Sequence, residues 1–151
     1  MSVRPLQPSD IPSLSAAVAE LPLMQRYQRT ADGIAQSFLG ALSRGESILV
    51  FDDGVHVQGF AWFLPTGTFA LGGYLRLIAV APGNNRKGIG TALLAAYEQA
   101  VAAQSRHAFL LVSDFNVDAQ RFYLRHGYKQ VGTLPGFVLP DVDELIFWKR
   151  L

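Results

Sequence analysis

The sequence contains no cysteine, and this absence excludes several kinds of chemistry. Disulfides, cysteine-based zinc sites and cysteine nucleophiles all require a thiol group. The histidines, His56, His107 and His126, are scattered along the chain and lack the spacing of metal ligands. We therefore expect no metal site and no covalent intermediate on a cysteine.

Long apolar runs and a strong net charge are also lacking. No apolar run approaches the ~18 residues that a membrane-spanning helix needs, and the first ten residues lack the apolar segment of a signal peptide. The formal net charge is +1, which provides no general attraction for nucleic acid, so an anion site would have to be local. We expect no membrane or nucleic-acid partner and, by default, a cytoplasmic protein.

The composition is that of a single globular domain. The chain has 151 residues, of which 50% are hydrophobic, enough to bury a core without covalent staples. No repeat, linker or low-complexity segment divides it. Residues 1–151 are therefore expected to form one domain.

A strand, a basic loop and a helix start follow one another between residues 74 and 91. Residues 77–80 form an apolar run typical of a buried strand, and a helical apolar pattern starts at Ile89. Between them lie glycines and the cations Arg86 and Lys87. A helix N-terminus offers unpaired N–H groups, and glycines let the backbone approach an anion. The stretch is either a phosphate-binding loop or an ordinary strand–turn–helix junction.

The other elements are predicted from hydrophobic periodicity, caps and turn residues. Strands are expected at 3–6, 47–51, 55–64, 107–112, 128–131 and 144–151. Helices are expected from Ser9 to Pro22, Thr30 to Gly45, Ile89 to Gln104 and Asn116 to Gly127. Residues 23–28 are expected to form a helical or irregular link.

The loop and helix start resemble motif A of the GCN5-related N-acetyltransferases, the GNAT family. The pattern V-x-P-x-x-[RQ]-x-x-G-[IL]-G-x-x-L is matched by Val80, Pro82, Gly88, Ile89, Gly90 and Leu93, with Asn85 in place of Arg or Gln. In this family the loop wraps the pyrophosphate of coenzyme A, mostly through backbone amides. The resemblance implies an acetyl-CoA site formed by Asn85, Arg86, Lys87, Gly88, Ile89, Gly90 and Thr91, in which Arg86 supplies the charge that Asn85 lacks.

A second stretch resembles motif B of the same family. The pattern N-x-x-A-x-x-[FL]-Y-x-x-x-G-[FY] is matched without a break by Asn116, Ala119, Phe122, Tyr123, Gly127 and Tyr128. Both motifs together cover residues 74–128, and they identify the chain as a member of the GNAT family. The implied fold is of the α/β (α+β) class, with a mixed, mostly antiparallel sheet and helices on both faces.

The resemblance also implies a mechanism of direct acetyl transfer to an amine. The pantetheine arm of acetyl-CoA would pair with the backbone of Ile78, Ala79 and Val80 as an added strand, and an N–H group there would face the thioester carbonyl. Asn116 caps a helix and would also contact the pantetheine or an ordered water. Tyr123 would protonate the departing thiolate, unless it only packs in the core.

The acceptor side is less clearly marked. Tyr27, Tyr74 and Phe137 would wall the amine site or belong to the core. Arg76 would anchor an acidic group of the substrate or lie at the strand edge with its charge in solvent. Residues 74–80 contain no acid to serve as general base, Leu111 stands where some relatives have a glutamate, and only Asp114 and the distant Glu144 remain. We assign no base from the sequence.

The function implied is an acetyl-CoA-dependent N-acetyltransferase acting on a primary amine of a small molecule. A protein N-terminus or lysine as acceptor stays open, as does a silent acyl-CoA-binding regulatory domain. Whether the protein forms a homodimer also stays open.

Overall fold

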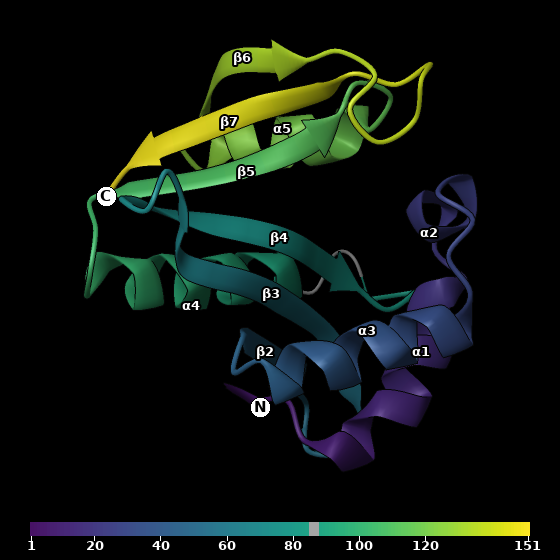
Figure 1. The fold of residues 1–151 in the computed structure, drawn as a ribbon. Coiled ribbons are helices and arrows are strands. Elements are labelled where there is room, and N and C mark those ends of the chain that lie inside the picture. The colour runs from purple at the N-terminus through teal and green to yellow at the C-terminus, as the bar shows by residue number, and fades with distance from the viewer. Residues whose placement is uncertain (85–87) are drawn as a thin grey trace.

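A single mixed sheet runs through the molecule in the computed structural model, which describes residues 1–84 and 88–151 (Figure 1). Within these residues the strand order is β1-β2-β3-β4-β5-β7-β6. The pairing of β4 with β5 is parallel and the other pairings are antiparallel, as expected for this fold class. The strands are β1 (Ser2–Pro5), β2 (Ser47–Asp52), β3 (Val57–Thr68), β4 (Gly72–Val80), β5 (His107–Ser113), β6 (Lys129–Leu134) and β7 (Glu144–Arg150).

Helices cover both faces of the sheet, which confirms the predicted layers (Figure 1). They are the 3-10 turn η1 (Pro8–Asp10) and the α-helices α1 (Ile11–Ala19), α2 (Pro22–Arg26), α3 (Ala31–Ser43), α4 (Ile89–Ala102) and α5 (Val117–Arg125). Pro22 does more than end the preceding helix: it is the first residue of α2, where a missing N–H group costs nothing. The expected link is thus a short helix followed by a turn.

Two separate cores result from this layering. On one face α4 and α5 pack on the sheet, with Leu93, Tyr97 and Phe147 almost fully buried. On the other face α1 and α3 cover the N-terminal strands, and the ring of Phe38 meets Phe60 edge-on at 4.9 Å between centroids. The sheet is therefore packed against helices on both of its faces.

The two central strands separate along their length. The pairing between β4 and β5 covers only residues 73–75 and 108–110. Beyond these rows β4 stays paired with β3 as far as Val80, and β5 stays paired with β7 as far as Ser113. One edge of each strand is therefore free of strand pairing where the strands diverge.

A β-bulge lies at the start of this divergence. Trp62 of β3 faces Leu77 while Phe63 faces Leu75, so Arg76 is an extra residue on β4. The extra residue reverses the alternation of side chains: Leu75 packs in the α4 core, whereas Leu77 packs in the α1–α3 core. The bulge places the exposed Arg76 side chain beside the separating strands.

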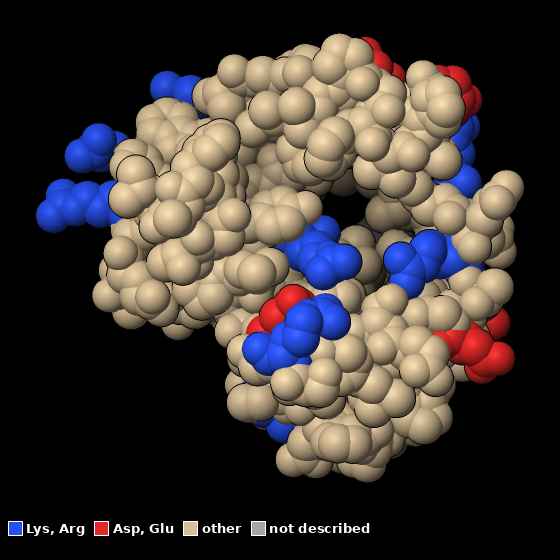
Figure 2. Space-filling model, viewed as in Figure 1, with Lys and Arg blue, Asp and Glu red and all other residues tan. Residues whose placement is uncertain are grey.

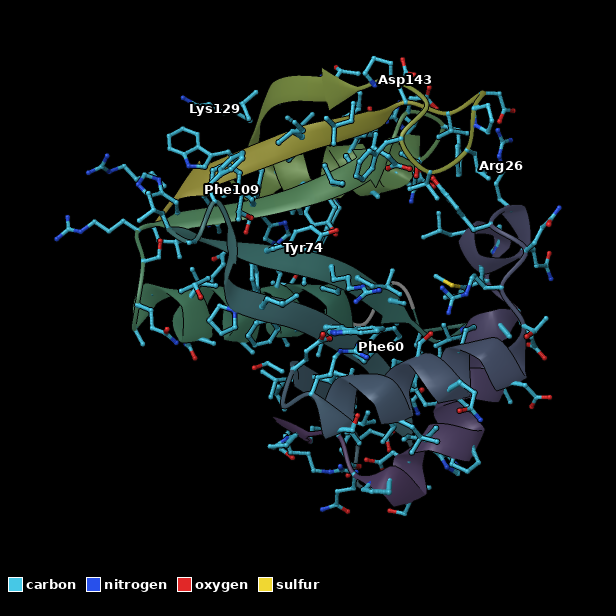
Figure 3. All side chains as sticks on the ribbon, in the orientation of Figure 1. Arg26, Phe60, Tyr74, Phe109, Lys129 and Asp143 are labelled. Atoms are coloured by element: carbon cyan, nitrogen blue, oxygen red, sulfur yellow. The ribbon has the colours of Figure 1, made fainter. Side chains whose placement is uncertain are left out.

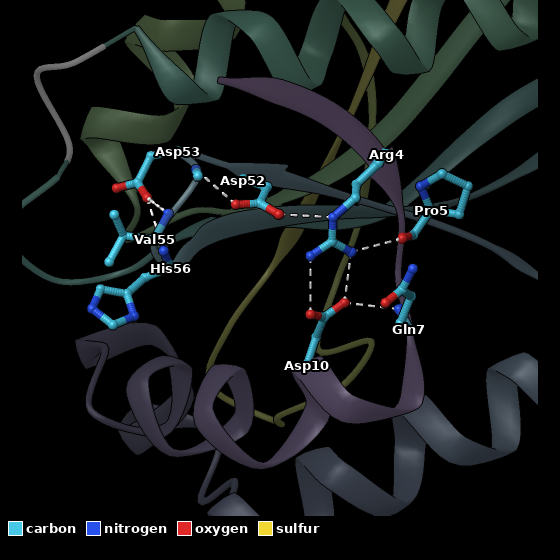
Figure 4. Close-up of polar contacts among 9 residues, drawn as sticks. Arg4, Pro5, Gln7, Asp10, Asp52, Asp53, Val55 and His56 are labelled. Atoms are coloured by element: carbon cyan, nitrogen blue, oxygen red, sulfur yellow. Dashed lines mark hydrogen bonds and ion pairs between the residues drawn. The ribbon is translucent and has the colours of Figure 1, made fainter.

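The first strand is fixed by a polar cluster away from the strand divergence (Figure 4). The guanidinium of Arg4 donates to Asp52 at 2.9 Å and to both carboxylate oxygens of Asp10 at 2.8 and 3.0 Å. These contacts join β1 to β2 and to the turn before α1. They hold the N-terminal helices in place against the sheet.

Candidate active site

A cleft of about 840 Å³ lies where β4 and β5 separate. Figure 2 shows a hollow near the centre of the molecule with basic side chains on its rim. The lining comes from both strands, from the starts of α4 and α2, and from one face of α5. The lining residues are Leu21, Pro22, Leu23, 75–80, Gly88, Gly90, Thr91, 111–113, Phe115, Asn116, Asp118, Ala119, Phe122, Tyr123, Arg125 and His126.

The start of α4 faces this cleft with its backbone. Gly88 is the N-cap and has a left-handed φ of 73°, and a Cβ built on it would meet no atom within 4 Å among the described residues beyond its chain neighbours. A Cβ on Gly90 would lie 3.4 Å from the Phe122 ring. The Ile89 side chain is buried in the core, so only its backbone is available to a ligand. This open, positively polarised helix start suits a phosphate group.

The predictions for Asn85, Arg86 and Lys87 lie outside the described residues. After these residues, Thr91 in the first turn of α4 lines the cleft, and its hydroxyl lies 3.2 Å from Nε2 of His126. His126 Nδ1 lies 2.7 Å from the carbonyl oxygen of Phe122. The contacts join the first turn of α4 to the end of α5 at the rim of the cleft.

Helix α5 faces the cleft with the side that carries the motif B residues Ala119, Phe122 and Tyr123. Asn116 caps the helix, its side chain accepting a hydrogen bond from the Ala119 N–H at 3.3 Å. Tyr123 lines the cleft two turns further along and is 6% exposed, and burial raises the pKa of its phenol. Its hydroxyl has no hydrogen-bond partner among residues 1–84 and 88–151. A protonated phenol with a free donor is what a general acid requires.

The free strand edges complete the coenzyme side. Ile78, Ala79 and Val80 line the cleft while their other edge pairs with β3. Backbone groups on an unpaired edge can bind an extended ligand as an additional strand. The described residues thus fit acetyl-CoA at the free strand edge of β4 and at the start of α4.

The acceptor side contains a buried polar cluster formed by Tyr27, Ser113 and Glu144. Ser113 and Glu144 face each other in the β5–β7 register, and both are buried. The Ser113 hydroxyl lies 3.2 Å from each carboxylate oxygen of Glu144, and the Tyr27 hydroxyl donates to the same carboxylate. Burial, followed by the hydrogen bond to Glu144, raises the pKa of Tyr27 to about 12.

Arg76 lines the cleft, whereas Tyr27, Tyr74 and Phe137 do not. The Arg76 guanidinium lies 4.2 Å from the centre of the Trp62 ring and 3.9 Å from a Glu46 oxygen, which keeps it at the rim. Tyr74 lies opposite Phe109 in the middle row of the short β4–β5 pairing (Figure 3).

Phe137, Tyr27 and Asp114, which the sequence suggested for the acceptor side, lie outside the cleft lining. Phe137 is 60% exposed in the loop between β6 and β7. Tyr27 does not line the cleft itself but contacts Ser113 and Phe115, which do. Asp114, one of the two acids considered from the sequence, is exposed.

Sequence reasoning missed the residues that join α2 to the far side of the cleft. Arg26 lies beside the β6–β7 loop, 3.6 Å from Asp141, and 4.5 Å above the Phe115 ring (Figure 3). The sequence leaves Glu144 as a distant candidate for the base, and the β5–β7 register brings it next to Ser113 at the end of the cleft. No local pattern reveals such a register, because it depends on which strands become neighbours.

Two further properties concern metals and membranes. Within residues 1–84 and 88–151, His, Asp and Glu side chains nowhere gather in a group of three or more that could hold a metal ion. No helix in those same ranges combines the length and apolar character needed to cross a bilayer.

The fold and cleft define an α+β protein suited to an extended ligand that bears phosphate groups. Comparison with known proteins identifies the family. A family model described as an acetyltransferase (GNAT) domain matches residues 44–130, more than half of the chain. The chain belongs to the GNAT acetyltransferase family. It is an N-acetyltransferase that uses acetyl-CoA.

Solved structures support the same fold. A GNAT-family protein from Desulfovibrio desulfuricans is 22% identical, with a TM-score of 0.83 over 99% of this chain and 98% of that one. An aminoglycoside 6'-N-acetyltransferase complexed with coenzyme A is 19% identical, with a TM-score of 0.81 over 99% and 97%. A ribosomal-protein-alanine N-acetyltransferase from Brucella melitensis is 22% identical, with a TM-score of 0.76 over 100% of both chains. The comparison with curated proteins found no match.

Proposed function

We propose that this enzyme transfers the acetyl group of acetyl-CoA directly to the primary amine of a small molecule. The observation that carries the proposal is the contact of α2 with the strands and loop across the cleft. Arg26 meets Asp141 of the β6–β7 loop, and Tyr27 meets Ser113 and Glu144. A peptide acceptor would need an open groove between these elements, and the contacts bridge it.

In this proposal, separate groups of residues bind the phosphates, bind the pantetheine arm and donate a proton. Gly88, Gly90 and Thr91 at the α4 start, together with Asn85, Arg86 and Lys87 of the loop before them, hold the phosphates. The β4 edge at residues 78–80 and the Asn116 cap hold the pantetheine arm. Tyr123 donates a proton to the sulfur as the thiolate leaves, while acetyl-CoA supplies the activated acetyl group.

A panel of acceptors tests the proposal. The enzyme is incubated with acetyl-CoA and, separately, n-propylamine, spermidine, kanamycin, a lysine-containing peptide and a peptide with a free N-terminal alanine. Thiol release and mass spectrometry of the products follow transfer. We expect acetylation of a small amine at a higher kcat/KM than of either peptide. Faster transfer to a peptide would overturn the small-molecule assignment, and coenzyme A binding without any transfer would support a silent acyl-CoA-binding domain.

The enzyme is proposed to act in the cytoplasm, in keeping with its composition. Fractionation of cells that express the tagged protein would test this. Size-exclusion chromatography with light scattering would show whether it forms a homodimer.

A further inference from the structure

We propose that Ser113 and Glu144 form the subsite that receives the ammonium group of the acceptor and removes its proton. This inference rests on the proposed function and assigns the proton acceptor that the sequence analysis left open. Ser113 lines the cleft, and Glu144 lies directly behind it on β7. The amine would meet the serine hydroxyl first, with the carboxylate as the charged group beyond.

The first argument is the charge of Glu144. It is 5% exposed, and no ion pair within residues 1–84 and 88–151 involves it. The cations closest to the cleft mouth on α2 and β4 are engaged elsewhere: Arg26 faces Asp141, and Arg76 faces Glu46. A buried carboxylate is normally paired with a cation, because desolvation of an unpaired charge is costly. An ammonium group in the cleft would supply that partner.

The second argument is a count of donors and acceptors. Tyr27 and Ser113 contribute one hydroxyl proton each, whereas a carboxylate offers about four lone-pair sites and each hydroxyl oxygen about two more. The cluster therefore has more acceptors than donors. An alkylammonium group carries three N–H donors and no acceptor, as a lysine does, so it complements this surplus.

The third argument is the contrast with the rest of the cleft. Its described lining includes the exposed cations Arg76 and Arg125 and one exposed carboxylate, Asp118, in the first turn of α5. A basic rim favours the anionic coenzyme but repels a cationic acceptor. A carboxylate buried near the strand ends gives the cation one favourable position, and that position adjoins the free edges of β4 and β5.

The proton balance of the step is simple. The ammonium nitrogen gives one proton to the Ser113 oxygen while the Ser113 hydroxyl proton passes to Glu144, which leaves a neutral amine. The amine nitrogen then bonds to the thioester carbon, the carbon–sulfur bond breaks, and the sulfur receives the Tyr123 proton. The second nitrogen proton is lost to solvent, Tyr123 regains a proton from solvent, and Glu144 releases its own.

The deciding variant is Glu144→Gln, which keeps the shape and an oxygen acceptor for Tyr27 but removes the charge. Glu98→Gln is the matched control, since Glu98 is a half-buried glutamate on α4 that pairs with Lys149 at 3.0 Å and lies outside the cleft lining. With the best amine of the panel, we expect kcat/KM to fall about 100-fold in Glu144→Gln, within the range for loss of a general base. The kcat/KM of the control should stay within about twofold of the wild-type value, a much smaller change than loss of a general base would cause.

A binding measurement separates this inference from the proposed function. Melting temperatures of the coenzyme A-saturated protein are recorded with n-propylammonium chloride, with sodium chloride at equal ionic strength and with 1-propanol. We expect only the ammonium salt to stabilise the wild type and Glu98→Gln, and expect no such effect in Glu144→Gln. Equal stabilisation of both variants, or a Glu144→Gln enzyme as active as its control, would show that Glu144 only anchors α2. Ammonium binding without acetyl transfer would instead contradict the proposed function and support the subsite.

Discussion

The hydroxyl oxygens of Tyr27 and Ser113 lie 2.7 Å apart, although 86 residues separate them in the sequence. Tyr27 directly follows α2, and Ser113 is the last residue of β5. Their contact therefore joins the N-terminal helices to the C-terminal half of the sheet across the cleft. The proposed acceptor side depends on this long-range contact, whereas the proposed coenzyme side is formed mainly by neighbouring segments.

The first prediction concerns the start of α4. Gly88→Val should abolish coenzyme A binding, measured by calorimetry, because the new side chain projects into the cleft where the phosphates are expected. Among the described residues other than its chain neighbours, no atom lies within 4 Å of the added Cβ, so a clash with them is not the cause.

Gly54→Val is the control for backbone strain at Gly88. Gly54 also has a left-handed φ, 94°, and open space around its Cβ, but it lies in the β2–β3 turn. Both variants should lose on the order of 1 kcal/mol of stability from the strained φ. Only the first should lose coenzyme A, and unchanged affinity in Gly88→Val would place the phosphate site elsewhere.

The second prediction concerns the Tyr123 hydroxyl. Tyr123→Phe keeps the buried ring and removes only the hydroxyl group. We expect acetyl-CoA binding to be unchanged and kcat to fall at least about tenfold, the low side of the range for a general acid. Tyr97→Phe is the comparison, because that buried hydroxyl instead donates to the Phe109 carbonyl at 3.0 Å. Wild-type kcat in Tyr123→Phe, with chemistry shown to be rate-limiting, would reject the role.

The third prediction concerns Arg76 at the β4 bulge. If Arg76 binds an acidic group of the acceptor, Arg76→Ala should raise the KM for the acceptor and leave that for acetyl-CoA nearly unchanged. Arg44→Ala provides the control, since Arg44 pairs with the same Glu46 at 2.9 Å and does not line the cleft. Equal changes in both KM values would instead indicate that Arg76 only stabilises the strand edge.

The fourth prediction concerns stability in acid. Backbone N–H groups of His56 and Val55, followed by the Gln58 side chain, lower the pKa of Asp53 to about 2 (Figure 4). A carboxyl with a lower pKa in the folded chain contributes its full stabilisation above the unfolded pKa, near 3.9, and loses it as the pH falls toward the folded value. Melting temperatures should therefore fall more steeply between about pH 4 and 2 in the wild type than in Asp53→Asn. Parallel curves for the two proteins would contradict this assignment.

Local patterns predicted the elements that line one side of the cleft. The helix start at Gly88 and Ile89 and the cleft-facing side of α5 both follow from residue spacing within one segment. Asn116 and Tyr123 are two turns apart on one helix, so periodicity alone places them on the same side. The structure places both in the lining of the cleft. Their contacts with acetyl-CoA and their chemical roles stay predictions.

The acceptor side could not be predicted in this way. The position of Glu144 depends on the register between β5 and β7, and the exposure of Arg76 depends on a one-residue bulge. Neither leaves a periodic signal, because each is decided by packing between segments that are distant in sequence. Helix α2 is only five residues long, too short for a clear periodicity.

The divergence of β4 and β5 has a consequence for the ligand-free enzyme in storage and in the cell. Within the described residues, their shared ladder ends after row 75–110, and the backbone edges beyond it are unprotected. Unpaired strand edges are templates for self-association, which many proteins avoid by covering them. Acetyl-CoA would cover the β4 edge if its pantetheine arm pairs there as proposed. Coenzyme A should therefore suppress aggregation of this enzyme, and a shortage of it would leave unpaired strand edges exposed in the middle of the sheet.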